Sequence, residues 1–185
     1  MQITKTALDG VVMLSPKKFG DQRGFFSETY NKRTLTDAGI DLEFVQDNHS
    51  LSVEVGVVRG LHFQSPPFAQ DKLVRVVRGR ILDVAVDLRQ KSPTFKQHVA
   101  VELSDTDWNQ LLVPIGFAHG FVTLEPNTEV IYKVTNYYSP ANDLGIRWND
   151  PTIGIAWPVS PENAILSTKD AVLPFLDQVS DTLLF

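Results

Sequence analysis

The chain has 185 residues, an apolar fraction of 43% and a formal net charge of −5. We expect one domain over residues 1–185, because this length is enough to bury a core. The acidic balance argues against nucleic acid as a partner, and no apolar run predicts a membrane span or a signal peptide. The absence of cysteine excludes disulfides and thiolate chemistry and favours a cytoplasmic protein.

The first predicted element is a short helix over residues 31–39, which Asn31 caps and Gly39 ends. Short segments rich in β-branched residues follow, each bounded by Gly, Pro, Asn or Asp, and these predict strands. The strands are expected at Lys72–Arg78, Arg80–Leu88, Val99–Leu103, Gln110–Val113 and Glu129–Thr135. Residues 137–153 have the composition of a loop, and the tail from Pro161 that of short helical turns. Many short strands indicate a sandwich or a barrel.

The segment from Gln46 to Gln64 contains histidine, arginine and several amides. A base and a fixed cation on one strand suggest proton chemistry on an anionic substrate. Strict alternation puts Arg59 and His62 on opposite faces of that strand. If both line one pocket, a β-bulge at Gly60 would turn them to the same side, or Arg59 would reach around from a strand end.

Two other strands each carry one polar residue on an apolar face. Lys72 shares its face with two valines, and so does Tyr132. A lysine at a strand start is usually exposed, and a strand tyrosine usually packs with its hydroxyl at the surface. The apolar neighbours favour a different interpretation, in which both residues point into a ligand pocket inside a barrel.

The spacing Pro114-x-Gly116-x-x-His119 resembles the second motif of the cupins, where a histidine points inward. The first cupin motif supplies a His-x-His pair and a glutamate, but His62 is followed by Gln64 at the matching place. A metal site needs about three protein ligands, so we expect no bound metal. The predicted fold is all-β, a cupin-type double-stranded β-helix (jelly roll) with a few short peripheral helices.

Two carboxylates are candidate partners for His62. Asp83 lies on a predicted strand, and Asp170 lies in a segment typical of a turn or a cap. The pattern alone leaves the choice between them open. Arg23, in a glycine-containing turn, is either a solvent-exposed hairpin residue or a clamp for phosphate or carboxylate.

Taken together, motifs from about residue 19 to residue 170 resemble the dTDP-4-dehydrorhamnose 3,5-epimerase family. The matching segments are Asp21-x-Arg23-Gly24-x-Phe26-x-Glu28, Gln46-Asp47-Asn48-His49-Ser50, Arg59-Gly60-Leu61-His62-x-Gln64, Lys72-Leu73-Val74-Arg75, Pro114-x-Gly116-Phe117-Ala118-His119-Gly120-Phe121, Tyr132-Lys133-x-Thr135, Gly145-Ile146-x-Trp148-x-Asp150-Pro151 and Leu166-Ser167-x-Lys169-Asp170. Phe63, where members commonly have tyrosine, and Asp143, where a glutamate is expected, depart from the pattern.

The resemblance implies a jelly roll that forms a homodimer with exchanged strands. It also implies a nucleotide-linked 4-keto-6-deoxyhexose as substrate, inverted at C3 and C5 through an enolate, without a cofactor. By resemblance His62 is the base, Asp170 orients it, Tyr132 is the opposing acid and Lys72 stabilises the oxyanion at O4. His119 would contact the sugar or support that stabilisation.

The remaining residues implied by the resemblance bind the substrate. Arg23 and Arg59 would hold the diphosphate, and Tyr138 would stack on the thymine ring. Sugar or nucleotide contacts are expected from Glu28, Gln46, Asn48, Asp143 and Lys169.

Three other functions compete with this prediction. One is a single-carbon epimerase on the same class of substrate, and another is a metal-dependent cupin enzyme. The third is a non-catalytic sugar-binding jelly roll, which would not need two opposed proton-transfer groups.

Overall fold

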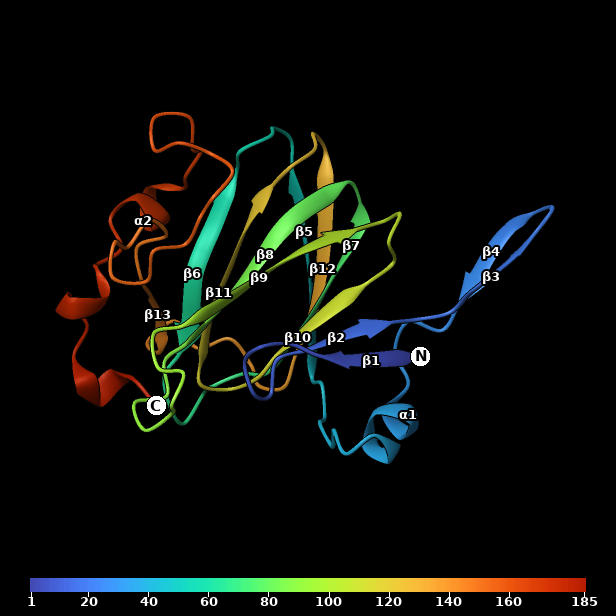
Figure 1. Cartoon of the computed structure of the whole chain (residues 1–185), viewed down its shortest axis with the longest axis horizontal. Coiled ribbons are helices and arrows are strands. Elements are labelled where there is room, and N and C mark those ends of the chain that lie inside the picture. Colours follow the sequence, from blue (N-terminus) through green and yellow to red (C-terminus); the bar gives the residue numbers. More distant parts are fainter.

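Two β-sheets face each other in the computed structural model, which describes residues 1–185 (Figure 1). One sheet has six strands in the order β1-β2-β10-β7-β12-β5, and the other has five in the order β13-β6-β11-β8-β9. All paired strands in both sheets are antiparallel. The predicted all-β class is therefore confirmed. No helix has the length and apolar character needed to cross a bilayer.

The six-stranded sheet consists of β1 (Gln2–Lys5), β2 (Val12–Ser15), β5 (Gln46–Ser52), β7 (Lys72–Arg78), β10 (Gln110–Val113) and β12 (Thr128–Val134). The five-stranded sheet consists of β6 (Val58–Gln64), β8 (Arg80–Asp87), β9 (His98–Ser104), β11 (Phe117–Thr123) and β13 (Asp143–Gly145). A separate hairpin is formed by β3 (Lys18–Asp21) and β4 (Gly24–Ser27). The helices are α1 (Lys32–Asp37) and α2 (Thr168–Ala171), with 3-10 turns at Leu176–Gln178 and Asp181–Leu183.

All the strands predicted from the sequence are present, each within one residue of the expected ends. The helix is also confirmed, because the Asn31 side chain accepts a hydrogen bond from the Thr34 amide at 3.2 Å and Gly39 has a φ of +84° just past its end. The loop predicted over residues 137–153 is wrong at β13. That strand pairs with the edge of β6 and is too short to show an alternating pattern.

The core between the sheets is apolar, and β8 shows how alternation builds it. Ile81 and Ala85 point inward and pack against side chains of the facing sheet, while Val84 and Val86 point outward. Asp83 therefore shares the inward face. The inward cluster also contains Val74, Val76, Leu111, Phe117, Phe121 and Val130, with Tyr132 packed against it. Lys72 and Tyr132 thus lie on the inner face of their strands, as the pattern predicted.

A C-terminal segment, residues 153–185, covers the outer face of the five-stranded sheet (Figure 1). Leu176 and Leu184 from this segment pack with Val84 and Val86 of β8 in one buried cluster. Burying an aliphatic side chain of this size contributes roughly 1.5–3 kcal/mol, so the segment is firmly held. It carries α2, and with it Asp170, to the side of β6.

The hairpin β3–β4 projects away from the two sheets (Figure 1). Its aromatic residues Phe19, Phe25 and Phe26 are 54%, 55% and 70% exposed. The base of the hairpin is fixed, because the Trp108 indole N–H donates to the Ser27 hydroxyl at 2.8 Å. An exposed aromatic surface of this kind is typical of a contact with another molecule.

Candidate active site

A bulge in β6 brings Arg59 and His62 to one cavity. His119 of β11 pairs with His62, but Phe121 pairs with Arg59, so β6 has one extra residue in this interval. The extra residue comes at Gly60, which has a φ of +111°. A Cβ there would lie 2.6 Å from the His119 carbonyl oxygen. Only glycine fits this close approach, and the predicted bulge is confirmed.

His62 is paired with Asp170 and not with Asp83. The distance from His62 Nε2 to Asp170 Oδ1 is 2.5 Å. The Ser167 hydroxyl caps α2, because it accepts a hydrogen bond from the Asp170 amide at 3.0 Å. This contact fixes the start of the helix. Burial opposes ionisation of Asp170, but hydrogen bonds from His62 and Ser167 hold its pKa below the ordinary value. An ionised Asp170 can only accept a hydrogen bond, so Nε2 of His62 carries the proton in this contact. The nitrogen without a proton in a neutral His62 is therefore Nδ1.

The other carboxylate, Asp83, is bonded to the second histidine of the cavity. His119 Nε2 lies 2.7 Å from Asp83 Oδ1, and both side chains are buried. Each histidine thus has its own carboxylate, a division that the sequence pattern left open.

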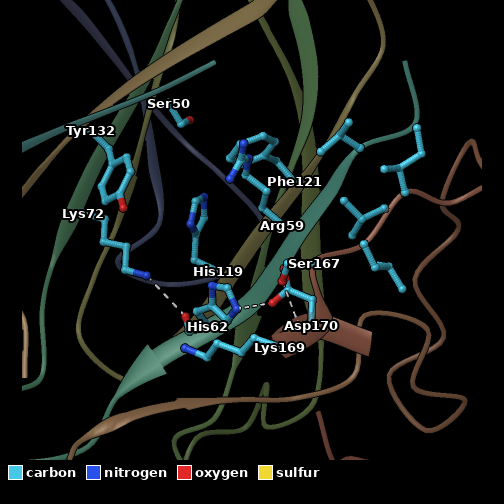
Figure 2. Close-up of a pocket in the computed structure, with 14 residues that line it drawn as sticks. Ser50, Arg59, His62, Lys72, His119, Phe121, Tyr132, Ser167, Lys169 and Asp170 are labelled. Carbon is cyan, nitrogen blue, oxygen red and sulfur yellow. Dashed lines mark hydrogen bonds and ion pairs between the residues drawn. The ribbon is translucent and has the colours of Figure 1, made fainter. Parts of the chain in front are cut away.

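Tyr132 and Lys72 come from the facing sheet (Figure 2). The Lys72 ammonium donates to the backbone carbonyl of His62 at 3.3 Å and so links the two sheets. Burial lowers the pKa of Lys72 to about 8, and the carboxylates of Asp143 and Asp83 oppose this shift. Burial also raises the pKa of Tyr132, so its hydroxyl remains protonated at neutral pH.

These groups surround a cavity of about 400 Å³ between the sheets. Figure 2 shows Tyr132 and Lys72 on one side, His62 with Asp170 on the other, and His119 between them. The Arg59 guanidinium is held at the cavity by the Ser52 hydroxyl at 3.2 Å and the Leu51 carbonyl at 3.1 Å. A cation, two histidines and a phenol inside apolar walls form a site for a polar, anionic molecule.

A second hollow of about 210 Å³ adjoins this cavity and shares His62, Lys72, Tyr132 and Lys169 with it. Its other lining includes Gln46, Asn48, Tyr138 and Asp143, all of them predicted substrate contacts. At its edge the Tyr138 hydroxyl donates to Asp143 at 2.8 Å, and Lys169 forms an ion pair with the same carboxylate. The Tyr138 ring is 57% exposed, which leaves a flat surface for stacking.

Two predicted site residues lie away from both the cavity and the adjoining hollow. Arg23 lies on the projecting hairpin, where it pairs with Asp21 and its side chain is 89% exposed. Glu28 follows the hairpin and is also exposed. Neither residue lines the cavity or the adjoining hollow within one chain.

Seven residues that line the cavity were not among the predicted site residues: Ser50, Val57, Val58, Phe121, Ile165, Leu166 and Ser167. Ser50 was detectable, because it lies on the same strand face as Gln46 and Asn48. No group of three or more His, Cys, Asp or Glu side chains is arranged to hold a metal ion.

Two facing sheets that enclose a polar, histidine-containing cavity define a cupin-type jelly roll, as predicted. The family model for dTDP-4-dehydrorhamnose 3,5-epimerase matches residues 5–178. The Salmonella typhimurium protein of that name is 55% identical over 181 residues, which cover 96% of this chain and 97% of the relative. The chain belongs to the dTDP-4-dehydrorhamnose 3,5-epimerase family, a family of isomerases.

Solved structures agree with this assignment. The Legionella pneumophila 3,5-epimerase in complex with dTDP-4-keto-L-rhamnose has a TM-score of 0.94 and 43% identity, covering 99% of this chain and 96% of that one. A 3'-monoepimerase from Streptomyces bikiniensis, in complex with dTDP-quinovose, has a TM-score of 0.88 and 30% identity, covering 94% and 87%. The same fold thus occurs in enzymes with different numbers of inverted carbons.

Proposed function

We propose that this protein inverts C3 and C5 of dTDP-4-dehydro-6-deoxy-D-glucose and yields dTDP-4-dehydro-L-rhamnose, a step of dTDP-L-rhamnose biosynthesis. One observation carries the proposal: a histidine base from one sheet and a protonated tyrosine from the other line the same cavity. Inversion at a carbon next to a ketone needs two such groups on opposite faces of the sugar.

In each inversion His62 Nδ1 takes the proton from the carbon, and the electron pair of the C–H bond moves into an enolate with its charge on O4. Asp170 stabilises the resulting imidazolium. The Tyr132 hydroxyl then gives its proton to the carbon from the other face, and the enolate collapses to the ketone. The tyrosinate and the imidazolium exchange protons with solvent, which restores the starting state.

Lys72 is the proposed stabiliser of the enolate oxygen. Its ammonium is fixed between the sheets by the His62 carbonyl, so it needs little reorganisation when charge develops. A donor of this type contributes a factor of about 10²–10³ to kcat in comparable sites. Because the reaction moves protons and no net electrons, we propose that it needs neither a cofactor nor a metal.

The nucleotide is proposed to extend across the cavity, which Arg59 lines, and the adjoining hollow, which Tyr138 lines. Tyr138 would stack on thymine, and Arg59 would bind the diphosphate. Polar contacts with the sugar and the nucleotide are assigned to Gln46, Asn48, His119, Asp143 and Lys169. The absence of cysteine fits a cytoplasmic location, which we also propose.

We further propose that each active site is completed by a second copy of the chain. The hairpin that carries Arg23 and precedes Glu28 projects from its own subunit and exposes aromatic side chains. Exchange of this hairpin in a homodimer would bring Arg23 and Glu28 to the partner's diphosphate and nucleotide site. In this arrangement residues 1–185 form a single domain, and each active site contains residues of both subunits.

The proposed reaction is tested with the dTDP-4-keto-6-deoxyglucose substrate in deuterated water. Deuterium at both C3 and C5 supports the proposal. Deuterium at one carbon would assign the single-carbon activity of the Streptomyces bikiniensis relative instead, and deuterium at neither carbon would reject the epimerase. A stoichiometric metal in the purified protein that is needed for activity would favour the metal-dependent alternative.

The shared site is tested by mixing two inactive or weakened subunits. An Arg23→Ala subunit keeps its base, and a His62→Ala subunit keeps its hairpin. A dimer with one subunit of each kind therefore has one complete site, and we expect activity above that of either variant alone at low substrate concentration. No gain after subunit exchange, or a monomer in analytical ultracentrifugation, would reject hairpin exchange.

A further inference from the structure

Gln64, the last residue of β6, has no part in the proposed reaction. It stands where the first cupin motif has its second histidine, and it lies on the same face of the strand as His62. Its side chain lines the hollow that adjoins the cavity, yet the residue is only 5% exposed. A buried amide is normally hydrogen-bonded within the protein, and the partners of Gln64 show what it holds.

The Gln64 amide is bonded to the backbone on either side of Tyr138. Its Nε2 donates to the Tyr137 carbonyl at 3.2 Å, and its Oε1 accepts from the Ser139 amide at 2.7 Å. Nε2 also donates to the Phe68 carbonyl at 2.6 Å. Both protons of Nε2 are therefore used within the protein, so neither is left to bind a substrate.

An amide side chain is the group that this position requires. It offers a donor and an acceptor side by side, as a peptide unit does, so it bonds the segment around Tyr138 as a neighbouring strand would. A carboxylate cannot donate to a carbonyl, and an apolar side chain leaves the backbone groups unpaired. A second amide, Gln46 on β5, accepts from the Tyr138 amide at 3.3 Å. The backbone of Tyr138 is thus held by strands of both sheets.

We propose that Gln64 is a positioning residue that presents the Tyr138 ring to the base of the bound nucleotide. The ring itself is 57% exposed, so its direction depends on the fixed backbone and on the bond from its hydroxyl to Asp143. This inference rests on the proposed function, because Tyr138 is assigned there to the thymine ring. Since His62 and Gln64 lie on one strand, the catalytic base and the stacking ring are kept at a fixed separation.

Binding of dTDP, measured by isothermal titration calorimetry, is the first test. Gln64→Met keeps the charge of the protein and a similar side-chain length but loses the donor and the acceptor. We expect the Kd of dTDP to rise about tenfold, as for the loss of one base–aromatic contact. The Kd of inorganic pyrophosphate, which has no base to stack, should stay within about twofold of the wild type.

Two results would overturn the proposal in this test. One is a Kd of dTDP within about twofold of the wild type, and the other is an equal weakening for pyrophosphate. Neither result touches the proposed epimerisation. A wild-type protein that does not bind dTDP would instead reject the proposed substrate, and this inference with it.

Coupling to Tyr138 separates positioning from a general loss of stability. Tyr138→Leu should raise the Kd of dTDP about tenfold, and adding Gln64→Met should raise it no further, because Gln64 acts through Tyr138. In turnover, Gln64→Met should raise KM about tenfold and leave kcat within about threefold, since the groups that transfer protons are unchanged. Additive losses of dTDP affinity, or a lower kcat at unchanged KM, would overturn the proposal.

Asn109→Leu is the matched control. Asn109 bonds the backbone on either side of Leu103 in the same way, because its Nδ2 donates to the Glu102 carbonyl at 2.8 Å and its Oδ1 accepts from the Ser104 amide at 3.2 Å. It lines neither hollow of the site. This variant should keep its Kd of dTDP within about twofold of the wild type. If it weakens dTDP as much as Gln64→Met does, the effect of Gln64 is structural and the proposal fails.

Hydrogen exchange in the wild type tests the arrangement without any substitution, so it decides the matter even if a Gln64 variant does not fold. Without nucleotide, the Ser139 amide should exchange slowly, because its partner is a buried side chain. Exchange of this amide at the rate of an unstructured peptide would show that the Tyr138 backbone is not held in advance, and would overturn the proposal.

Discussion

The two histidine–carboxylate pairs of this protein have the same hydrogen-bond geometry but differ in their exposure to solvent. His62 and His119 each use Nε2, at 2.5 and 2.7 Å from a carboxylate oxygen. The His62 side chain is 30% exposed and that of His119 is 9% exposed. One carboxylate comes from the C-terminal segment, and the other is built into β8. The same pair of side-chain types therefore occurs once at an accessible place and once at a buried one, and the two environments favour different uses of the imidazole.

The largest expected effect is at the accessible pair. His62→Ala should lower deuterium incorporation at both C3 and C5 by about 10⁴-fold, because a positioned general base accounts for a factor of this order. NMR of the sugar in deuterated water measures it. Tyr132→Phe provides the contrast, since it should impair completed inversion more than the initial exchange. If His62→Ala still exchanges both protons at the wild-type rate, the base is wrongly assigned.

The next effect lies between the two pairs, at Lys72. Lys72→Met should lower kcat by about 10²–10³. In the wild type, kcat/KM should fall as the pH rises above about 8, because the free enzyme then loses the Lys72 cation whose pKa is lowered by burial. The pH profile of Lys72→Met should lack this decline. A decline of the same size and position in the variant would assign it to another group.

The bulge that brings Arg59 and His62 to one cavity gives a smaller effect, on stability. In Gly60→Ala the new methyl group would lie 2.6 Å from the His119 carbonyl oxygen at a φ of +111°. We expect a loss of about 3 kcal/mol in the free energy of unfolding, measured with urea. Gly39→Ala is the control, with a φ of +84° and no atom near the new methyl group, and should cost about 1 kcal/mol. Equal losses of stability in Gly60→Ala and Gly39→Ala would show that the contact of the new methyl group with β11 does not destabilise the protein.

The smallest effect is expected outside the cavity. Arg23→Ala should raise KM by about tenfold with kcat retained, because it removes one charge-assisted contact to the diphosphate. Arg33→Ala, an exposed arginine of α1, should leave KM unchanged. If both variants behave alike, the hairpin arginine does not bind substrate.

Strand positions and the bulge were accessible from the sequence because they depend on local patterns. Alternation placed Lys72 and Tyr132 among apolar residues, and the position of Gly60 predicted the irregularity in β6. Pairings between distant residues were not accessible in this way. Asp83 and Asp170 are both plausible partners of His62 by pattern, and the choice depends on which face of β8 turns inward and where the C-terminal segment docks.

Arg23 shows a different limit. Its motif predicts an anion contact, yet within one chain its side chain is 89% exposed and lies on a projecting hairpin. A sequence describes one subunit, so it does not tell whether a binding residue serves its own subunit or a neighbour. The three residues of β13 were missed because a short edge strand has no periodicity to detect.

The origin of Asp170 in the C-terminal segment has a consequence for biosynthesis. Every strand of both sheets precedes this residue in the chain. During translation the ribosome therefore releases the strands that carry His62, Lys72 and Tyr132 before Asp170 emerges. The nascent strands can pair while His62 still lacks its carboxylate, and the contact between His62 and Asp170 forms when the segment that carries Asp170 docks beside β6.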